Sequence, residues 1–252
     1  MSYLSRRPSG TQPTHAMVLA AGLGTRLRPV TANKPKPLVA VGGRTLIDRA
    51  LDRLADDGIT TAVVNLHYLG DMIEAHLQNR PRPRVVFNRE PVLLDTGGGI
   101  AAVLPLLGER PFFTVNSDVF WLNGPTTALA RLGAAWDDEA MDGLLMMHST
   151  VEAFGYDGLG DFVVDPFGRL SRRPQKEVSA TLFTGVQILH PRLFADAPRG
   201  AFSLNVLWDR AIEAGRLYGM VHDGEWFHVG TPEGLAAAEA YLSTAFPDSR
   251  RR

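Results

Sequence analysis

Hydrophobic and polar positions follow two different periods along the first half of the chain. Short apolar runs predict buried strands over residues 17–20, 61–66, 84–87 and 111–118. Apolar residues at helical spacing predict helices over residues 44–57, 69–77 and 100–107. Because strands and helices alternate from residue 16 to about residue 120, we expect a mostly parallel, Rossmann-like sheet with helices on both faces.

The pattern changes beyond about residue 140. Strand patterns separated by glycine turns occur over residues 141–149, 161–165 and 182–189. Helical spacing returns over residues 204–214 and 232–242, where Gly215 ends the first helix and Thr231 is the expected N-cap of the second. The sequence therefore predicts an α/β fold that carries a smaller antiparallel lobe.

The first predicted strand runs directly into a glycine loop, AAGLGTRLRP over residues 20–29. Small residues let the backbone approach a ligand, and consecutive N–H groups can point at an anion. Arg26 can grip phosphate oxygens two at a time, and Lys36 lies between two prolines that keep its segment extended. Since ligands of parallel sheets bind at the carboxyl ends of strands, this loop predicts a triphosphate site.

Two other phosphate-binding loops are excluded. Nothing in the chain matches the P-loop pattern, in which Gly-Lys-Ser/Thr follows a first glycine by five residues. The dinucleotide fingerprint needs a third glycine where this chain has Leu27. A structural turn with solvent-exposed arginines remains the alternative interpretation of the loop.

Two further segments carry candidate chemistry. Three glycines, Gly97 to Gly99, precede the helix predicted from residue 100, and they would let the backbone press against a flat ligand such as a base or a sugar. The alternative is a flexible loop.

Asp118 ends the predicted strand 111–118, where a carboxylate can bind Mg²⁺ together with phosphate oxygens. The alternative for Asp118 is an Asx turn or a helix cap.

Composition limits the class of protein. The chain has 252 residues, a formal net charge of −1 and 45% hydrophobic residues, which suits one α/β domain and gives no basic surface for nucleic acid. It contains no cysteine, so disulfides, thiolate metal sites and cysteine nucleophiles are excluded. No apolar stretch approaches the roughly 18 residues of a membrane span. Residues 1–14 lack the apolar core of a signal peptide, and we interpret them as a disordered leader of a cytoplasmic protein.

The segment LAAGLGTRLRPVT over residues 19–31, followed by Pro35-Lys36-Pro37, resembles the signature of the sugar-1-phosphate nucleotidylyltransferase family. The resemblance implies transfer of a nucleotidyl group from a nucleoside triphosphate to a sugar 1-phosphate, with Arg26, Lys36 and Asp118 as the catalytic residues. It implies that the nucleotide is bound by Ala20, Ala21, Gly22, Gly24, Thr25, Arg26, Lys36, Gly97 and Gly98. It implies that the sugar phosphate contacts Asn116, Asp161 and Thr184.

The resemblance has one departure, in the segment Trp226-Phe-His-Val-Gly-Thr231. The family usually has a metal-binding aspartate where this chain has His228. Imidazole is a poor ligand for Mg²⁺ but a good one for Mn²⁺, Co²⁺ or Zn²⁺. His228 is thus expected to bind a metal together with Asp118; the alternatives are that it leaves Mg²⁺ to Asp118 and the phosphates, or that it binds a phosphate directly.

The resemblance covers residues 15–245, which we expect to form one domain. Its nucleotide-binding half would span residues 15–135 and its sugar-phosphate-binding half residues 136–245, before a flexible tail over 246–252. The resemblance, carried by residues 94–100, residues 184–191 and the length of the chain, favours UTP and N-acetylmuramate 1-phosphate as substrates. It implies peptidoglycan recycling by a monomer or small homo-oligomer that binds neither nucleic acid nor membrane. GTP with mannose 1-phosphate is the alternative, as is a non-catalytic sensor of nucleotide sugars. A glycosyltransferase is disfavoured because the chain has no Asp-x-Asp motif.

Overall fold

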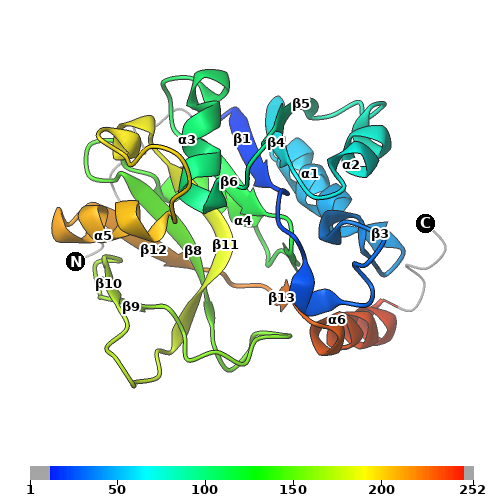
Figure 1. The fold of residues 1–252 in the computed structure, drawn as a ribbon. Helices are drawn as coiled ribbons and strands as arrows, with labels where there is room; N and C mark the ends of the chain where they lie inside the picture. Colours follow the sequence, from blue (N-terminus) through cyan, green and yellow to red (C-terminus); the bar gives the residue numbers. More distant parts are fainter. Residues whose placement is uncertain (1–11, 247–252) are drawn as a thin grey trace.

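The computed structural model describes residues 12–246 (Figure 1). The leader predicted over residues 1–14 lies outside the described residues except for its last three positions, and the predicted tail lies outside them except for Phe246. The backbone carbonyl of Thr14 accepts a hydrogen bond from the N–H of Thr60 at 2.9 Å. The chain is therefore attached to the fold immediately before its first strand.

A nine-stranded sheet forms the centre of the molecule. The first half of the chain supplies four strands that pair in parallel, β1 (His15–Leu19), β4 (Thr61–Leu66), β5 (Arg84–Arg89) and β6 (Phe112–Asn116). Strand β1 pairs with both β4 and β6, and its last residue, Leu19, lies opposite Asn116 at the end of β6. The carboxyl ends of these strands thus meet at one edge, where the predicted phosphate loop begins.

The rest of the sheet comes from the second half of the chain. These strands are β8 (Gly143–Ser149), β9 (Phe162–Val164), β10 (Leu170–Arg172), β11 (Thr181–Leu189) and β12 (Leu217–Val221). Strand β11 pairs antiparallel with β6, β8 and β9, so the predicted antiparallel lobe extends the same sheet. Two ribbons stand apart from it: β2 (Ala40–Val41) with β3 (Arg44–Thr45), and β7 (Val119–Trp121) with β13 (Trp226–His228).

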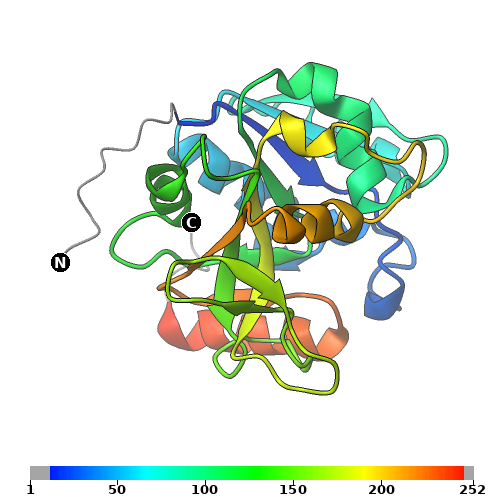
Figure 2. The same ribbon diagram turned by 90° about the vertical axis from the view of Figure 1, so that its left-hand side faces the viewer.

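Helices cover both faces of the sheet, as the alternating pattern predicted. They are α1 (Leu46–Asp56), α2 (Gly70–Leu77), α3 (Asp95–Leu107), α4 (Ala128–Ala135), α5 (Asn205–Glu213) and α6 (Pro232–Ala245). Figure 2 shows the sheet between α4 on one side and α3 and α5 on the other. Successive strand residues point to opposite faces, so Val18 packs with the core under α1 and α4 while Met17 packs with the core under α3 and α5. The predicted fold class is confirmed.

Three 3₁₀ helices complete the described elements: η1 (Thr25–Leu27), η2 (Lys36–Leu38) and η3 (Pro191–Phe194). The predicted cap of the last helix is correct, since the hydroxyl of Thr231 accepts the N–H of Gly234 at 3.2 Å. Within residues 12–246, no helix combines the length and the apolar character needed to cross a membrane.

The three consecutive glycines do not precede a helix as predicted; they lie inside one. Helix α3 begins at Asp95, and Gly97, Gly98 and Gly99 are buried in its first turns. The N–H groups of Gly97 and Gly98 donate to the carbonyl of Phe202 at 2.9 and 3.1 Å, and a Cβ on Gly98 would overlap the carbonyl oxygen of Gly200. These glycines let the segment before α5 lie directly against α3.

This packing predicts that Gly98→Ala destabilises the fold by about 2 kcal/mol, because the backbone at Gly200 must move away from the added methyl group. Urea denaturation would measure the loss. Gly22→Ala is the matched control, since an added Cβ there meets nothing within 4 Å. If Gly98 contacts only a ligand, as the sequence predicted, the Gly98→Ala variant would keep its stability and lose nucleotide affinity instead.

Candidate active site

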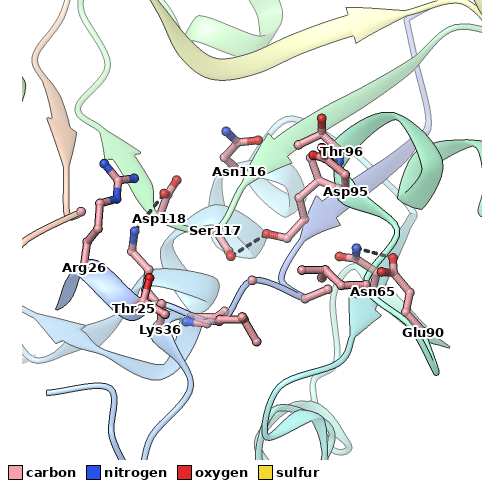
Figure 3. Close-up of a pocket in the computed structure, with 18 residues that line it drawn as sticks. Thr25, Arg26, Lys36, Asn65, Glu90, Asp95, Thr96, Asn116, Ser117 and Asp118 are labelled. Atoms are coloured by element: carbon pink, nitrogen blue, oxygen red, sulfur yellow. Dashed lines mark hydrogen bonds and ion pairs between the residues drawn. The ribbon is translucent and has the colours of Figure 1, made fainter. Parts of the chain in front are cut away.

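A cavity of about 530 Å³ lies at the carboxyl ends of the parallel strands (Figure 3). Eight of the site residues predicted from the sequence line it: Ala21, Gly22, Gly24, Thr25, Arg26, Lys36, Asn116 and Asp118. They come from segments up to 97 residues apart, from residue 21 to residue 118, which the pairing of β1 with β6 brings together. The structure thus assembles the proposed phosphate loop and the proposed metal ligand around one space.

The glycine loop follows β1 and turns at Gly24, which has a φ of 65° in the left-handed region that favours glycine. A Cβ on Gly24 would come within 3.2 Å of the Lys36 side chain, so this glycine lets the loop pack closely on the lysine segment. The hydroxyl of Thr31 donates to the Gly24 carbonyl at 2.8 Å and fixes the turn. A Cβ on Gly22 would meet nothing within 4 Å, so the loop is open to a ligand on that side.

Lys36 and Asp118 form an ion pair across the cavity, with 2.9 Å between Nζ and Oδ2. The lysine side chain is only 11% exposed because η2 packs it beneath the loop, while the aspartate side chain is 28% exposed. Burial alone would raise the pKa of Asp118, but His228 and the Lys36 ammonium favour the carboxylate more strongly and hold that pKa well below its usual range. Asp118 is therefore ionised at neutral pH.

His228 lies at the end of β13, with its Nε2 3.7 Å from Oδ2 of Asp118. Its Nδ1 lies 3.2 Å from the carbonyl oxygen of Gly155, which can only accept a hydrogen bond. With a cation bound, a proton on Nδ1 would leave the lone pair of Nε2 to the cation; without one, Nε2 faces the Asp118 carboxylate and favours its charged form. A Cβ at position 230 would overlap the imidazole, so Gly230 makes the room that this ring occupies.

Asp118 and His228 offer one carboxylate and one imidazole to a divalent cation. Among the described residues, no group of three or more His, Cys, Asp or Glu side chains is arranged to enclose a metal. Mg²⁺ is often held by one or two carboxylates with substrate phosphates, so the pair fits a cation that arrives with a nucleotide. The imidazole favours Mn²⁺ or a softer ion over Mg²⁺.

Sequence reasoning missed two polar residues at the opposite end of the cavity, Asn65 and Glu90 (Figure 3). The Asn65 amide donates to Glu90 Oε1 at 2.7 Å and accepts the N–H of Ala20 at 2.7 Å, and both side chains are buried. The hydrogen bond from the Ala20 N–H to Asn65 anchors the start of the glycine loop. The resemblance had implied instead that Ala20 binds the nucleotide. The signal that the sequence offered was Asn65, a single polar residue near the end of the apolar run over residues 61–66.

Of the three residues predicted to contact the sugar phosphate, only Asn116 lines the cavity. The Asp161 carboxylate instead accepts the N–H of Phe183 at 2.8 Å. The Thr184 hydroxyl is fully buried and donates to the carbonyl of Met146 at 2.7 Å. Gly97 and Gly98 also lie outside the lining of the cavity that residues 12–246 form. The structure gives these four residues contacts that hold the fold.

Comparison with known proteins gives consistent matches over nearly the whole chain. A family model described as "Nucleotidyl transferase" matches residues 15–244. The chain is 46% identical over 238 residues to N-acetylmuramate alpha-1-phosphate uridylyltransferase of Caulobacter vibrioides, covering 92% of this chain and 98% of that protein. The Neisseria meningitidis protein of the same name is 36% identical, with 89% and 96% covered.

A solved structure supports the fold independently. HddC from Yersinia pseudotuberculosis, in a complex with GMP-PN, superposes with a TM-score of 0.73 at 22% sequence identity. The match covers 91% of this chain and 99% of HddC. At this level of identity, the likeness establishes the shared architecture alone.

Proposed function

Because the chain belongs to the nucleotidyl transferase family, we propose that it transfers the uridylyl group of UTP to N-acetylmuramate 1-phosphate. The products are the UDP-sugar and pyrophosphate. The observation that carries the proposal is the cavity in which Arg26, Lys36 and Asp118 converge under the glycine loop. The choice of substrates is supported by the 46% identical relative, 98% of whose length this chain matches.

In the proposed reaction, a phosphate oxygen of the sugar 1-phosphate attacks the α-phosphorus of UTP. A new oxygen–phosphorus bond forms, the bond between the α-phosphorus and the bridging oxygen breaks, and pyrophosphate leaves in line. Such transfers depend on positioning and on neutralising charge, so no side-chain nucleophile is needed.

The position of each residue in the cavity determines which part of the substrates it would bind or neutralise. Arg26 and the loop N–H groups hold the β- and γ-phosphates, which become the leaving group. Lys36 neutralises charge where the α-phosphate and the sugar phosphate meet. The Asn65–Glu90 pair lies at the other end of the cavity, where the buried carboxylate can accept an N–H of the base.

Asp118 and His228 would hold the divalent cation, with Mg²⁺ as the general expectation and Mn²⁺ favoured by the imidazole. The cation supplies positive charge to the phosphate oxygens when it is bound. Because N-acetylmuramate is a cell-wall sugar, the reaction belongs to peptidoglycan recycling in the cytoplasm under this proposal.

Pyrophosphate release tests the proposal directly. The purified protein would be assayed with UTP or GTP, against N-acetylmuramate 1-phosphate, glucose 1-phosphate or mannose 1-phosphate, first in Mg²⁺ and then in Mn²⁺. We expect the highest kcat/KM for UTP with N-acetylmuramate 1-phosphate. A preference for GTP with mannose 1-phosphate would keep the reaction and overturn the substrates. Nucleotide binding without release in any combination would favour a sensor.

A further inference from the structure

A second pocket, of about 240 Å³, lies between α1 and the β7 ribbon. Three arginines line it, Arg44, Arg49 and Arg53, with Phe120 and Trp121 of β7. Asp52 and Asp56 also contribute to the lining. This arginine pocket shares no lining residue with the catalytic cavity, although β7 begins directly after Asp118.

Among the described residues, the two acidic residues form an ion pair with only one of the three arginines, Arg44. Asp52 is already engaged by two cations, Arg44 at 2.6 Å and Arg80 from outside the pocket. Asp56 is exposed and pairs with none of the three arginines in the part of the chain that the structure describes. Glu239 and Asp57 add negative charge near Arg49 and Arg53. The capacity for an anion therefore lies in the N–H donors of these two arginines, which form no ion pair in the part of the chain that the structure describes.

Arg53 is the pocket arginine with the most N–H donors that lack an acceptor among the described residues. Among the described residues it forms no ion pair, and its one hydrogen bond is long, 3.5 Å from Nη2 to the carbonyl of Trp121. A half-buried guanidinium in this state has donors left for an anion, because Arg presents five N–H groups.

Arg49 is held rigidly beside it. Its Nε donates to the Val41 carbonyl at 3.2 Å, and its guanidinium lies 4.9 Å from the centre of the Phe120 ring. Burial and the neighbouring charges of Arg53 and Arg44 lower the pKa of Arg49. An anion placed between these arginines would relieve the repulsion among them.

We propose that the arginine pocket is a second anion-binding site, which takes a compact phosphate group at Arg49 and Arg53. Arginine pairs oxygens of phosphate in a planar, two-point geometry that lysine lacks. The volume is below the roughly 300–1,000 Å³ of pockets that enclose drug-sized ligands, which favours inorganic phosphate or a small phosphate ester over a nucleotide.

Side-chain NMR can test the site with inorganic phosphate as the probe. The Nε–H signals of Arg49 and Arg53, assigned by substitution, would be followed as phosphate is added to the full-length protein at constant ionic strength. We expect both signals to shift along one saturating curve. We also expect the curve to persist in Arg26→Gln, which weakens any phosphate binding in the catalytic cavity.

Arg53→Gln should raise the phosphate concentration for half-saturation, followed at Arg49, by at least about tenfold, since a charge-assisted hydrogen bond is lost. Arg84→Gln removes an exposed arginine of β5 and is the matched control, expected to change nothing. Arg44→Gln provides a second pocket variant on an exposed side chain. The proposal is overturned if neither signal saturates, if chloride at equal ionic strength gives the same shifts, or if Arg53→Gln binds phosphate like the control.

Discussion

Replacing Lys36 by methionine is expected to lower kcat/KM for pyrophosphate release by about a thousandfold. Methionine keeps the length of the buried side chain and removes its charge, so the loss reports on the ammonium group and not on packing. Removal of a single preorganised charge donor from an active site typically costs on the order of 10²–10³ in rate. Steady-state assays with the preferred substrate pair would measure the change.

Lys34→Met is the matched control for this prediction, because Lys34 belongs to the same proline-containing segment and is exposed. It should keep activity within about threefold of the unmodified protein, as surface substitutions usually do. Urea denaturation of both variants would separate lost chemistry from lost folding. A Lys36→Met variant that is folded and nearly as active as the control would remove Lys36 from the mechanism.

The sequence predicted the part of the site that is encoded locally. Gly22, Gly24 and Arg26 follow a strand within seven residues, and their chemistry is readable from spacing alone. The contact between Lys36 and Asp118 spans 82 positions, so no local pattern contains it. The α/β alternation predicted only that the glycine loop and Asp118 both lie at the carboxyl ends of strands, which converge at one edge of the sheet.

Four predicted site residues, Gly97, Gly98, Asp161 and Thr184, lie outside the lining of the cavity, and their contacts with substrate stay predictions. Gly97 and Gly98 allow close approach of backbone, but the sequence does not say whether the partner is a ligand or another segment of the chain. Here the partner is the segment that ends at Phe202, about a hundred positions away. Thr184 and Asp161 were assigned to the sugar phosphate by resemblance, and in this structure their side chains form tertiary hydrogen bonds with the backbone of Met146 and Phe183.

The second large effect is expected for Asp118→Asn. The substitution keeps the shape of the side chain and removes the charge that faces Lys36 and His228. We expect kcat to fall by about 10²–10³, since both the ion pair and the carboxylate ligand are lost. The divalent-cation concentration for half-maximal activity should also rise by at least about tenfold.

Titrations of activity with Mg²⁺ and with Mn²⁺ would measure that shift, and His228→Ala separates the two ligands. If Nε2 binds the cation, His228→Ala should weaken the Mn²⁺ response by about tenfold and change the Mg²⁺ response less, because Mg²⁺ prefers oxygen. An Asp118→Asn variant whose cation dependence is unchanged would exclude the carboxylate as a ligand.

The double variant Lys36→Met/Asp118→Asn decides how the pair works. Oppositely charged groups 2.9 Å apart are coupled, so the two losses should not add. If the main role of Lys36 is to position Asp118 and keep it ionised, the double variant will be no slower than Asp118→Asn alone. If Lys36 instead touches the reacting phosphates itself, as proposed, its removal will cost further rate even after the aspartate charge is gone. The kcat of the double variant relative to Asp118→Asn therefore measures the contact between Lys36 and the transition state.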